Sequence, residues 1–282
     1  MCKLLACDLD GTLFYPKKVR RCISHRNVNF LRKWIDSGNK VVLITSRSAE
    51  FVERLKDEIQ RPFDVMACTS AQIFHDGEII RDKWMPNKEL ETILKKIDEK
   101  YKPIGYLLTA KDNPCVVYNT NRKGKLFLIF YRFYYWFQFK YREPAFIDNN
   151  LFNDLIKNGK VYKVMTFFGF GKSKRTLSKE INKELRENFP AIESSWSLIV
   201  NELTPRGCNK GEGLEFYCQK VGIDEKDVYV VGDSGNDIAM FQRFHEHSYC
   251  MLHAYPSVKK YAKHTIARVY KLGKLVLKGE KK

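Results

Sequence analysis

Residues 3–14 read Lys3-Leu4-Leu5-Ala6-Cys7-Asp8-Leu9-Asp10-Gly11-Thr12-Leu13-Phe14. The apolar run at its start predicts a buried parallel strand that ends near Asp8. Gly11 permits a sharp turn there, at the carboxyl end of the strand, where open α/β sheets bind ligands. Asp8 and Asp10 are neighbouring carboxylates that repel each other unless a cation or a shared proton intervenes, so the pair indicates a hard metal ion. A strand end closed by an Asx-turn is the alternative for this stretch taken alone.

Three stretches farther along the chain repeat this combination of a regular element and polar residues. Residues 41–44 form a second apolar run, which ends in the hydroxyl of Thr45. Lys210 opens a helix-like pattern, and the β-branched run at residues 228–231 leads into a cluster of glycine and acid residues. That cluster reads Gly232-Asp233-Ser234-Gly235-Asn236-Asp237. The order and spacing of the four stretches make chance a poor explanation.

Taken together, the four stretches resemble the haloacid dehalogenase superfamily of phosphotransferases. Within it they are similar to the Cof-type phosphatases of subclass IIB, which carry a large α/β cap between the second and third motifs. The resemblance implies an α/β fold with a Rossmann-like three-layer core around a parallel sheet, plus an inserted α+β cap domain. We expect the core to comprise residues 1–82 and 195–282, and the cap to comprise residues 83–194.

The resemblance also implies a catalytic pair and a metal site. Asp8 would attack phosphorus and form an aspartyl-phosphate, which divides the reaction into two steps. Asp10 would protonate the leaving alcohol and then activate water for the second step. A Mg²⁺ cofactor would be held by the Asp8 carboxylate, the Asp10 backbone carbonyl and Asp233.

Four further residues acquire roles from the same resemblance. Thr45 would donate a hydrogen bond to the phosphoryl oxygens, and Lys210 would place a positive charge beside them and beside Asp8. Asn236 would donate to the phosphate. Asp237 would orient Lys210 or a metal-bound water.

These assignments predict a Mg²⁺-dependent phosphatase acting on a small phosphorylated metabolite, with a sugar phosphate as the first expectation. A phosphomutase that uses the same phosphoryl clamp is the alternative. A third possibility is a basic nucleic-acid-binding protein on a phosphatase scaffold that has lost its catalytic activity. This possibility is disfavoured because the catalytic motif residues Asp8, Asp10, Lys210 and Asp233 are all present. The sequence does not identify the substrate or the cap residues that select it.

The composition sets limits on the location of the protein. Its 282 residues, of which 44% are apolar, suffice for two packed domains. No apolar run approaches the roughly 20 residues of a membrane helix, and Asp8 and Asp10 interrupt the N-terminal run that a signal peptide requires. The eight cysteines are scattered without a Cys-x-x-Cys pair, which argues against a zinc site or a disulfide framework. We therefore expect a cytoplasmic protein with no membrane contact.

The charge is strongly positive, with a formal net value of +17. Such an excess steers anionic small substrates toward a protein, and it also permits nucleic-acid binding. No nucleic-acid motif accompanies the basic clusters, so we favour a solvated lysine-rich surface and do not expect a nucleic-acid partner. The oligomeric state stays open.

Local signals predict the order of the core elements. Ser24 is expected to cap a helix that stops at Gly38, followed by a strand at 40–45, a helix at 48–58 and a strand at 64–68. This β-α-β-α-β order predicts a parallel sheet with right-handed crossovers. Asp76-Gly77 indicates the tight turn of a hairpin within residues 72–80.

The expected cap contains helices and strands in mixed order. The predicted helices and strands are 88–101, 115–119, 161–168, 176–188 and 197–202. Residues 127–146 stand out because eleven of the twenty are aromatic. Their periodicity fits a strand or a helix, and similarity to the family favours a helix. The stretch could fill the cap core, form a lid over the substrate, or form a dimer interface.

Overall fold

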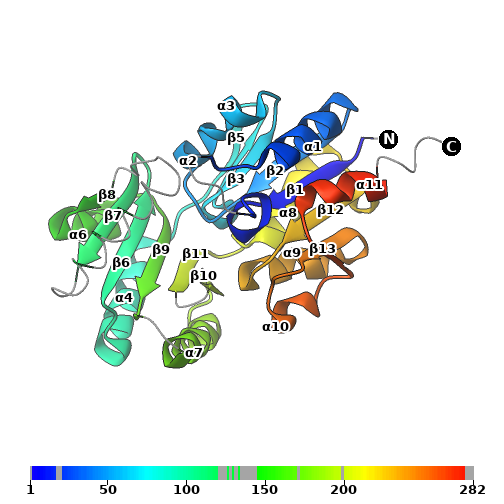
Figure 1. Ribbon diagram of the computed structural model, residues 1–282. Coiled ribbons are helices and arrows are strands. Elements are labelled where there is room, and N and C mark those ends of the chain that lie inside the picture. The colour runs from blue at the N-terminus through cyan, green and yellow to red at the C-terminus, as the bar shows by residue number, and fades with distance from the viewer. Residues whose placement is uncertain are drawn as a thin grey trace. The chain divides into compact units, whose positions relative to one another are not determined.

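The computed structural model describes residues 2–16, 21–119, 126, 129, 133, 145–169, 172–197 and 200–276. The chain divides into two compact units, one formed by Met1–Arg81 with Asn209–Lys282 and the other by Asp82–Cys208. Figure 1 labels their helices and strands. No described helix has the length and apolar character needed to cross a membrane.

The first unit is built on an eight-stranded sheet in the order β14-β13-β12-β1-β2-β3-β4-β5. The pairs from β14 through β3 are parallel, whereas β4 runs antiparallel to β3. The strands are β1 (Leu4–Asp8), β2 (Lys40–Ile44), β3 (Asp64–Ala67), β4 (Gln72–His75), β5 (Glu78–Asp82), β12 (Val228–Gly232), β13 (Ser248–Met251) and β14 (His264–Ile266). The predicted parallel sheet is therefore confirmed.

Helices cover both faces of this sheet and give the expected three layers (Figure 1). On one face, Leu4 and Ala6 of β1 belong to an apolar cluster with residues of α8 (Lys210–Val221) and α9 (Ile238–Arg243). On the other face, Trp34 of α1 (His25–Asp36) packs edge-on against Tyr229, with ring centres 5.8 Å apart. A fully buried side chain of the size of Leu4 contributes about 1.5–3 kcal/mol to folding.

Several local predictions hold at single-residue level. The side chain of Ser24 accepts a hydrogen bond from the backbone N–H of Asn27, and α1 ends just before Gly38, whose φ is +81°. Asp76 and Gly77 both have positive φ in the turn between β4 and β5, as a two-residue hairpin requires. The helix expected at 48–58 is instead two short helices, α2 (Ala49–Glu53) and α3 (Leu55–Ile59).

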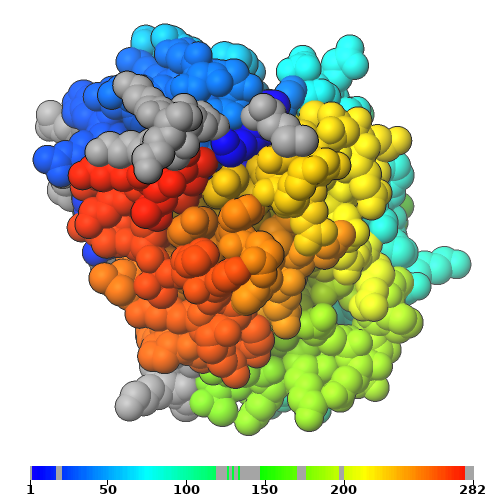
Figure 2. Space-filling view, turned by 90° about the vertical axis from the view of Figure 1, so that its right-hand side faces the viewer, coloured from blue at the N-terminus to red at the C-terminus, as the bar shows by residue number. Residues whose placement is uncertain are grey.

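The C-terminal segment packs onto the start of the core. The backbone N–H of Tyr270 donates to Oδ1 of Asn27 at 3.1 Å, and the guanidinium of Arg26 lies 5.7 Å from the ring centre of Tyr270. Figure 2 shows the red C-terminal residues beside the blue N-terminal part of the unit. Two short helices complete this region, α10 (Pro256–Lys259) and α11 (Leu272–Val276).

The second unit contains a six-stranded sheet in the order β10-β11-β9-β6-β7-β8. Its pairs are antiparallel except for β7 with β8, which is parallel. Side chains from α4, α6 and α7 form one apolar cluster with the sheet. The elements are α4 (Asn87–Tyr101), β6 (Gly105–Ala110), β7 (Asn113–Asn119), β8 (Ala145–Ile147), α6 (Asn149–Asn158), β9 (Val161–Phe167), α7 (Lys172–Asn188), β10 (Ile192–Ser197) and β11 (Val200–Pro205).

The boundary between the units differs from the sequence prediction at its second crossing. Residues 195–208, expected in the core, lie in the second unit. The reason is backbone pairing, because β10 pairs with β11 and β11 pairs with β9 in the second sheet. The aromatic stretch 127–146 lies almost entirely outside the described residues, so the three interpretations offered for it stay predictions.

Candidate active site

Three parallel strands bring the predicted site residues to one edge of the first sheet. In register, Asp8 of β1 pairs with Ile44 of β2, and Cys7 pairs with Val231 of β12. Thr45 therefore follows β2 beside Asp8. The glycine and acid cluster follows β12 on the other side. The three motifs, far apart in sequence, meet at the carboxyl ends of these strands, where ligands bind in open α/β sheets.

The turn after β1 is shaped by Gly11. Its φ of +81° is a conformation that suits glycine. A Cβ at this position would lie 2.3 Å from Oδ2 of Asp233, so the turn also depends on the absence of a side chain. The next residue, Thr12, donates its hydroxyl to Oδ1 of Asp233 at 3.1 Å. The first turn and the loop after β12 are thereby tied together.

Lys210 is the central cation of the site and is fully buried. It is the first residue of α8, whose start is capped by Asn209 through a hydrogen bond from the backbone N–H of Glu212. The ammonium Nζ donates to Oδ1 of Asp8 and to Oδ1 of Asp237, both at 2.6 Å. Lys210 thus links β1 to the loop after β12 with two buried ion pairs.

Asp237 is also fully buried, and both of its oxygens are engaged. Oδ1 accepts from Lys210, while Oδ2 accepts the backbone N–H groups of Asp233 and Ser234, each at 2.9 Å. With both oxygens occupied, Asp237 is suited to holding Lys210 and the loop in place. This contact agrees with the first of the two roles predicted for it.

Burial is the main cause of the pKa shifts of Asp8 and Asp233. Loss of solvent raises the pKa of Asp8 well above its usual range, against the opposing effect of Lys210. The same cause raises the pKa of Asp233 to about 7, with added repulsion from Asp237. Although burial alone would lower the pKa of the Lys210 ammonium, the two carboxylates raise it, so Lys210 remains charged.

Asp8 presents an open ligand atom for a cation, in a cluster of three acids. Ligand atoms of Asp8, Asp233 and Asp237 lie within 4.8 Å of one another. Oδ2 of Asp8 is buried and has no hydrogen-bond partner among the described residues. A divalent cation beside Asp8 and Asp233 would offset the burial of both negative charges. The donor set of carboxylate oxygens fits a hard metal ion such as Mg²⁺.

The remaining predicted residues lie around this centre. Thr45 is buried, and its Oγ1 accepts the backbone N–H of Arg47 at 3.1 Å. Asp10 is held by two hydrogen bonds from the guanidinium of Arg47, at 2.6 and 2.7 Å. The side-chain oxygen of Asn236 accepts from Ser234 Oγ at 2.6 Å. The phosphate contact predicted for Asn236 stays a prediction.

Sequence reasoning missed three residues of this neighbourhood. The sequence assigned no role to Arg47, and it placed Thr12 only within the first motif. His253, in the loop after β13, lies against Tyr15 with ring centres 4.0 Å apart and the rings tilted by 34°. Its Nε2 lies 3.7 Å from Oδ2 of Asp233. Burial lowers its pKa. A lone histidine far from the four motifs gave no signal that could have placed it here.

Comparison with known proteins agrees with this geometry. The family pattern of haloacid dehalogenase-like hydrolases matches residues 5–273. This chain is a haloacid dehalogenase-like hydrolase. Phosphatases of this family use a divalent metal ion, for which Asp8, Asp233 and Asp237 form the candidate acidic site.

Individual relatives are distant but cover nearly the whole chain. The 5-amino-6-(5-phospho-D-ribitylamino)uracil phosphatase YwtE of Bacillus subtilis (strain 168) is 24% identical over 255 residues, which are 85% of this chain and 84% of that protein. A solved protein of Streptococcus mutans UA159 is 17% identical, with a TM-score of 0.81 and coverage of 99% and 100%. A solved subclass IIB sugar phosphatase is 20% identical, with a TM-score of 0.73 and coverage of 97% and 98%. The hydrolase is thus a phosphatase of the Cof-type group, and its fold is that of subclass IIB.

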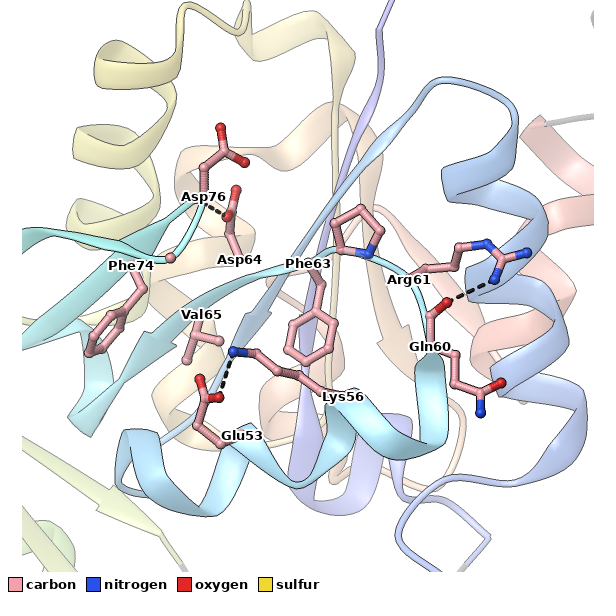
Figure 3. Close-up of a pocket in the computed structure, with 11 residues that line it drawn as sticks. Glu53, Lys56, Gln60, Arg61, Phe63, Asp64, Val65, Phe74 and Asp76 are labelled. Atoms are coloured by element: carbon pink, nitrogen blue, oxygen red, sulfur yellow. Dashed lines mark hydrogen bonds and ion pairs between the residues drawn. The ribbon is translucent and has the colours of Figure 1, made fainter.

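The hydrolase has a second acidic cluster, at the amino end of β3, where Asp64, His75 and Asp76 lie close together. Both oxygens of Asp64 are already engaged: Oδ1 accepts the Asp76 backbone N–H at 2.9 Å, and Oδ2 accepts the Tyr217 hydroxyl at 2.5 Å. Nδ1 of His75 also lies 2.9 Å from Oδ2. Figure 3 shows Asp64 and Asp76 at the border of a cavity of about 680 Å³. Because protein donors satisfy Asp64, we assign this cluster a structural role.

The dependence on Gly11 yields a prediction for the hydrolase. In Gly11→Ala the new methyl group would displace Asp233 from the acid cluster, so Mg²⁺ affinity should fall about tenfold or more, as when ligand-supporting contacts are lost. Calorimetric titration with Mg²⁺ measures this directly.

Gly38→Ala provides the matched control for that variant. Gly38 has the same φ of +81°, but no described atom lies within 4 Å of the position of its Cβ. The control should therefore lose about 1 kcal/mol of stability through backbone strain and keep its Mg²⁺ affinity. Equal Mg²⁺ affinity in Gly11→Ala and wild type would contradict the assignment of Asp233 to the metal site.

Proposed function

We propose that the chain is a Mg²⁺-dependent phosphatase that hydrolyses a small phosphorylated metabolite through an aspartyl-phosphate. The observation that carries this proposal is the arrangement around Asp8. One oxygen of Asp8 is held at 2.6 Å by the buried ammonium of Lys210, while the other is buried without a hydrogen-bond partner among the described residues. A carboxylate fixed on one side and open on the other is suited to attack phosphorus.

The proposed reaction has two steps. In the first, an oxygen of Asp8 forms a bond to phosphorus while the bond to the leaving oxygen breaks, and Asp10 gives that oxygen a proton. In the second, Asp10 takes a proton from a water molecule while the water oxygen forms a bond to phosphorus. The bond between phosphorus and Asp8 breaks, which releases inorganic phosphate and restores the Asp8 carboxylate. Each step leaves Asp10 in the protonation state that the next step requires.

Other residues would bind the phosphoryl group and the metal. Thr45 and Asn236 would donate hydrogen bonds to phosphoryl oxygens, and Lys210 would neutralise charge shared between phosphate and Asp8. Mg²⁺ would be held by Asp8, by the Asp10 carbonyl and by Asp233. Once bound, it would supply Lewis-acid stabilisation of negative charge on the phosphoryl oxygens.

The proposed substrate class is a sugar phosphate or a related phosphorylated metabolite. Two relatives support this class, since one is named as a phosphatase of a phosphoribitylamino-uracil and the other as a sugar phosphatase. The net charge of +17 favours the approach of anionic esters.

A screen of phosphorylated metabolites tests the proposal. Purified protein should release inorganic phosphate with Mg²⁺, lose that activity with EDTA and regain it when Mg²⁺ is added back. Release that is unaffected by EDTA would contradict the metal site. An isomerised ester without free phosphate would identify a phosphomutase instead.

The raised pKa of Asp233 predicts that Mg²⁺ affinity depends on pH. The folded, metal-free protein holds a proton on Asp233 up to about pH 7, whereas the usual pKa of an aspartate is 3.8. Mg²⁺ must displace that proton, so affinity should be about tenfold weaker at pH 6 than at pH 8. In the unfolded chain Asp233 ionises near pH 4, whereas in the folded, metal-free protein it ionises near pH 7. The stability of the metal-free protein should therefore fall as pH rises from about 4 to about 7.

Calorimetric titration with Mg²⁺ at the two pH values checks this prediction. Asp224→Asn, which removes an exposed acid preceding the same strand, should show the wild-type pH dependence. Equal affinity at pH 6 and pH 8 in wild type would show that no proton is displaced and would contradict the prediction.

A further inference from the structure

Arg47 binds Asp10, the proposed acid–base residue, through two hydrogen bonds. Its Nε donates to Oδ2 of Asp10 at 2.6 Å, and its second guanidinium nitrogen donates to Oδ1 at 2.7 Å. Two parallel charge-assisted hydrogen bonds define both the position and the rotation of a carboxylate. Lysine cannot reproduce this geometry with its single ammonium group.

Arg47 is itself held from several directions. Its side chain is only 8% exposed, and its guanidinium lies 4.1 Å from the ring centre of Phe51, which is fully buried. Its backbone N–H donates to Thr45 Oγ1 at 3.1 Å, and its carbonyl accepts the backbone N–H of Cys68 at 2.8 Å. The turn after β2 therefore presents the Thr45 hydroxyl and the Arg47 guanidinium as one rigid piece.

Asp10 lacks comparable packing. Its side chain is 49% exposed, and its backbone belongs to the turn that contains Gly11. A half-exposed carboxylate in such a turn can adopt several rotamers, and fixing it requires a partner that is fixed already. The buried, stacked guanidinium of Arg47 meets that requirement.

We propose that Arg47 is the positioning residue of Asp10, a role that rests on the proposed function of Asp10 as acid and base. The two contacts hold the Asp10 carboxyl group in one orientation, which fixes the position of the oxygen that would give its proton to the leaving oxygen. As that proton moves, the bond between phosphorus and the leaving oxygen breaks.

Leaving groups of different basicity separate this role from simple structural support. An alkyl phosphate such as glycerol phosphate needs proton transfer to its leaving oxygen, whereas 4-nitrophenyl phosphate releases a stable anion. Because kcat/KM reports steps up to departure of the leaving group, it isolates the acid role of Asp10 from the later attack of water. Arg47→Ala should lower kcat/KM about 10²-fold for the alkyl ester and less than about threefold for the aryl ester.

Two further variants sharpen the test. Arg47→Lys keeps the charge without the two parallel hydrogen bonds, so its loss on the alkyl ester should lie between wild type and Arg47→Ala. Arg54→Ala removes the other guanidinium near the ring of Phe51, 5.7 Å from its centre, and should leave the ratio of the two substrates unchanged.

The outcomes distinguish the positioning role from the proposed function. Equal losses on both esters, unchanged kinetics, or a gain with the alkyl ester in Arg47→Ala would each overturn the positioning role. A wild-type enzyme that hydrolyses neither ester with Mg²⁺ would remove the proposed function, and the role of Arg47 with it.

Discussion

Asp8→Asn is expected to abolish phosphate release, with kcat reduced by about 10⁴-fold or more. The amide retains an oxygen that can accept the hydrogen bond from Lys210 at the position of Oδ1, so the ion-pair network loses a charge without losing its shape. It cannot act as the nucleophile, because an amide oxygen is a far weaker donor of electrons to phosphorus than a carboxylate. Rates of phosphate release from the best substrate of the metabolite screen measure the loss.

The fold should survive this change, which makes the loss of rate interpretable. The pKa of the buried Asp8 carboxylate is raised because burial disfavours its negative charge. Replacing the carboxylate with a neutral amide removes the free-energy cost of burying that charge. The melting temperature of the metal-free variant should equal or exceed that of the wild type.

Asp64→Asn is the matched control for Asp8→Asn. Asp64 is also a buried aspartate of a core strand, but it lies at the amino end of β3 and bonds Tyr217 and Asp76. Its replacement should lower stability by about 1–3 kcal/mol and leave kcat close to wild type. Turnover in Asp8→Asn above about one hundredth of wild type would contradict the nucleophile assignment.

The sequence was informative wherever a functional residue follows a regular element in a short motif. Asp8 is the last residue of a buried strand, and Thr45 and Asp233 each come directly after one. Parallel pairing alone is enough to place these strand ends on one edge. Lys210 starts a capped helix, and its contacts with Asp8 and Asp237 agree with the contact predicted from the family. The catalytic roles of these residues stay predictions.

Contacts between distant loops could not be predicted in this way. Arg47 binds Asp10 while its guanidinium lies over the ring of Phe51. His253 lies near Asp233 and against the ring of Tyr15. Neither pairing leaves a periodic or spacing signal in the chain. Such contacts depend on the tertiary arrangement of loops, which local patterns do not encode.

The cap was predicted less completely for a related reason. β6 and α6 were not expected, and the strand expected at 197–202 proved to be parts of β10 and β11. Short apolar runs fit a strand or a buried helix equally well. Their assignment depends on which neighbours they pair with, and the pairing of β11 with β9 also moved the boundary of the unit.

Lys210→Met is expected to damage stability and activity together. The variant keeps the apolar bulk of the side chain but leaves Asp8 and Asp237 as two buried carboxylates without their shared cation. Breaking a buried ion pair from one side lowers stability by about 3–5 kcal/mol. Loss of the positive charge beside the phosphoryl group should reduce kcat about 10²- to 10³-fold. Urea unfolding and steady-state kinetics, both with Mg²⁺ present, measure the two effects.

A control and a second mutation separate the charge effect from the loss of packing. Lys220→Met changes an exposed lysine of the same helix and should alter stability by less than about 0.5 kcal/mol. In the Lys210→Met background, Asp237→Asn should restore part of the lost stability, because it removes one of the two uncompensated charges while an amide oxygen can still accept from the backbone of Asp233. Activity should not return, since the cation beside Asp8 is still missing. Additive losses of stability in the double variant would show that Lys210 stabilises the core through packing rather than through its two ion pairs.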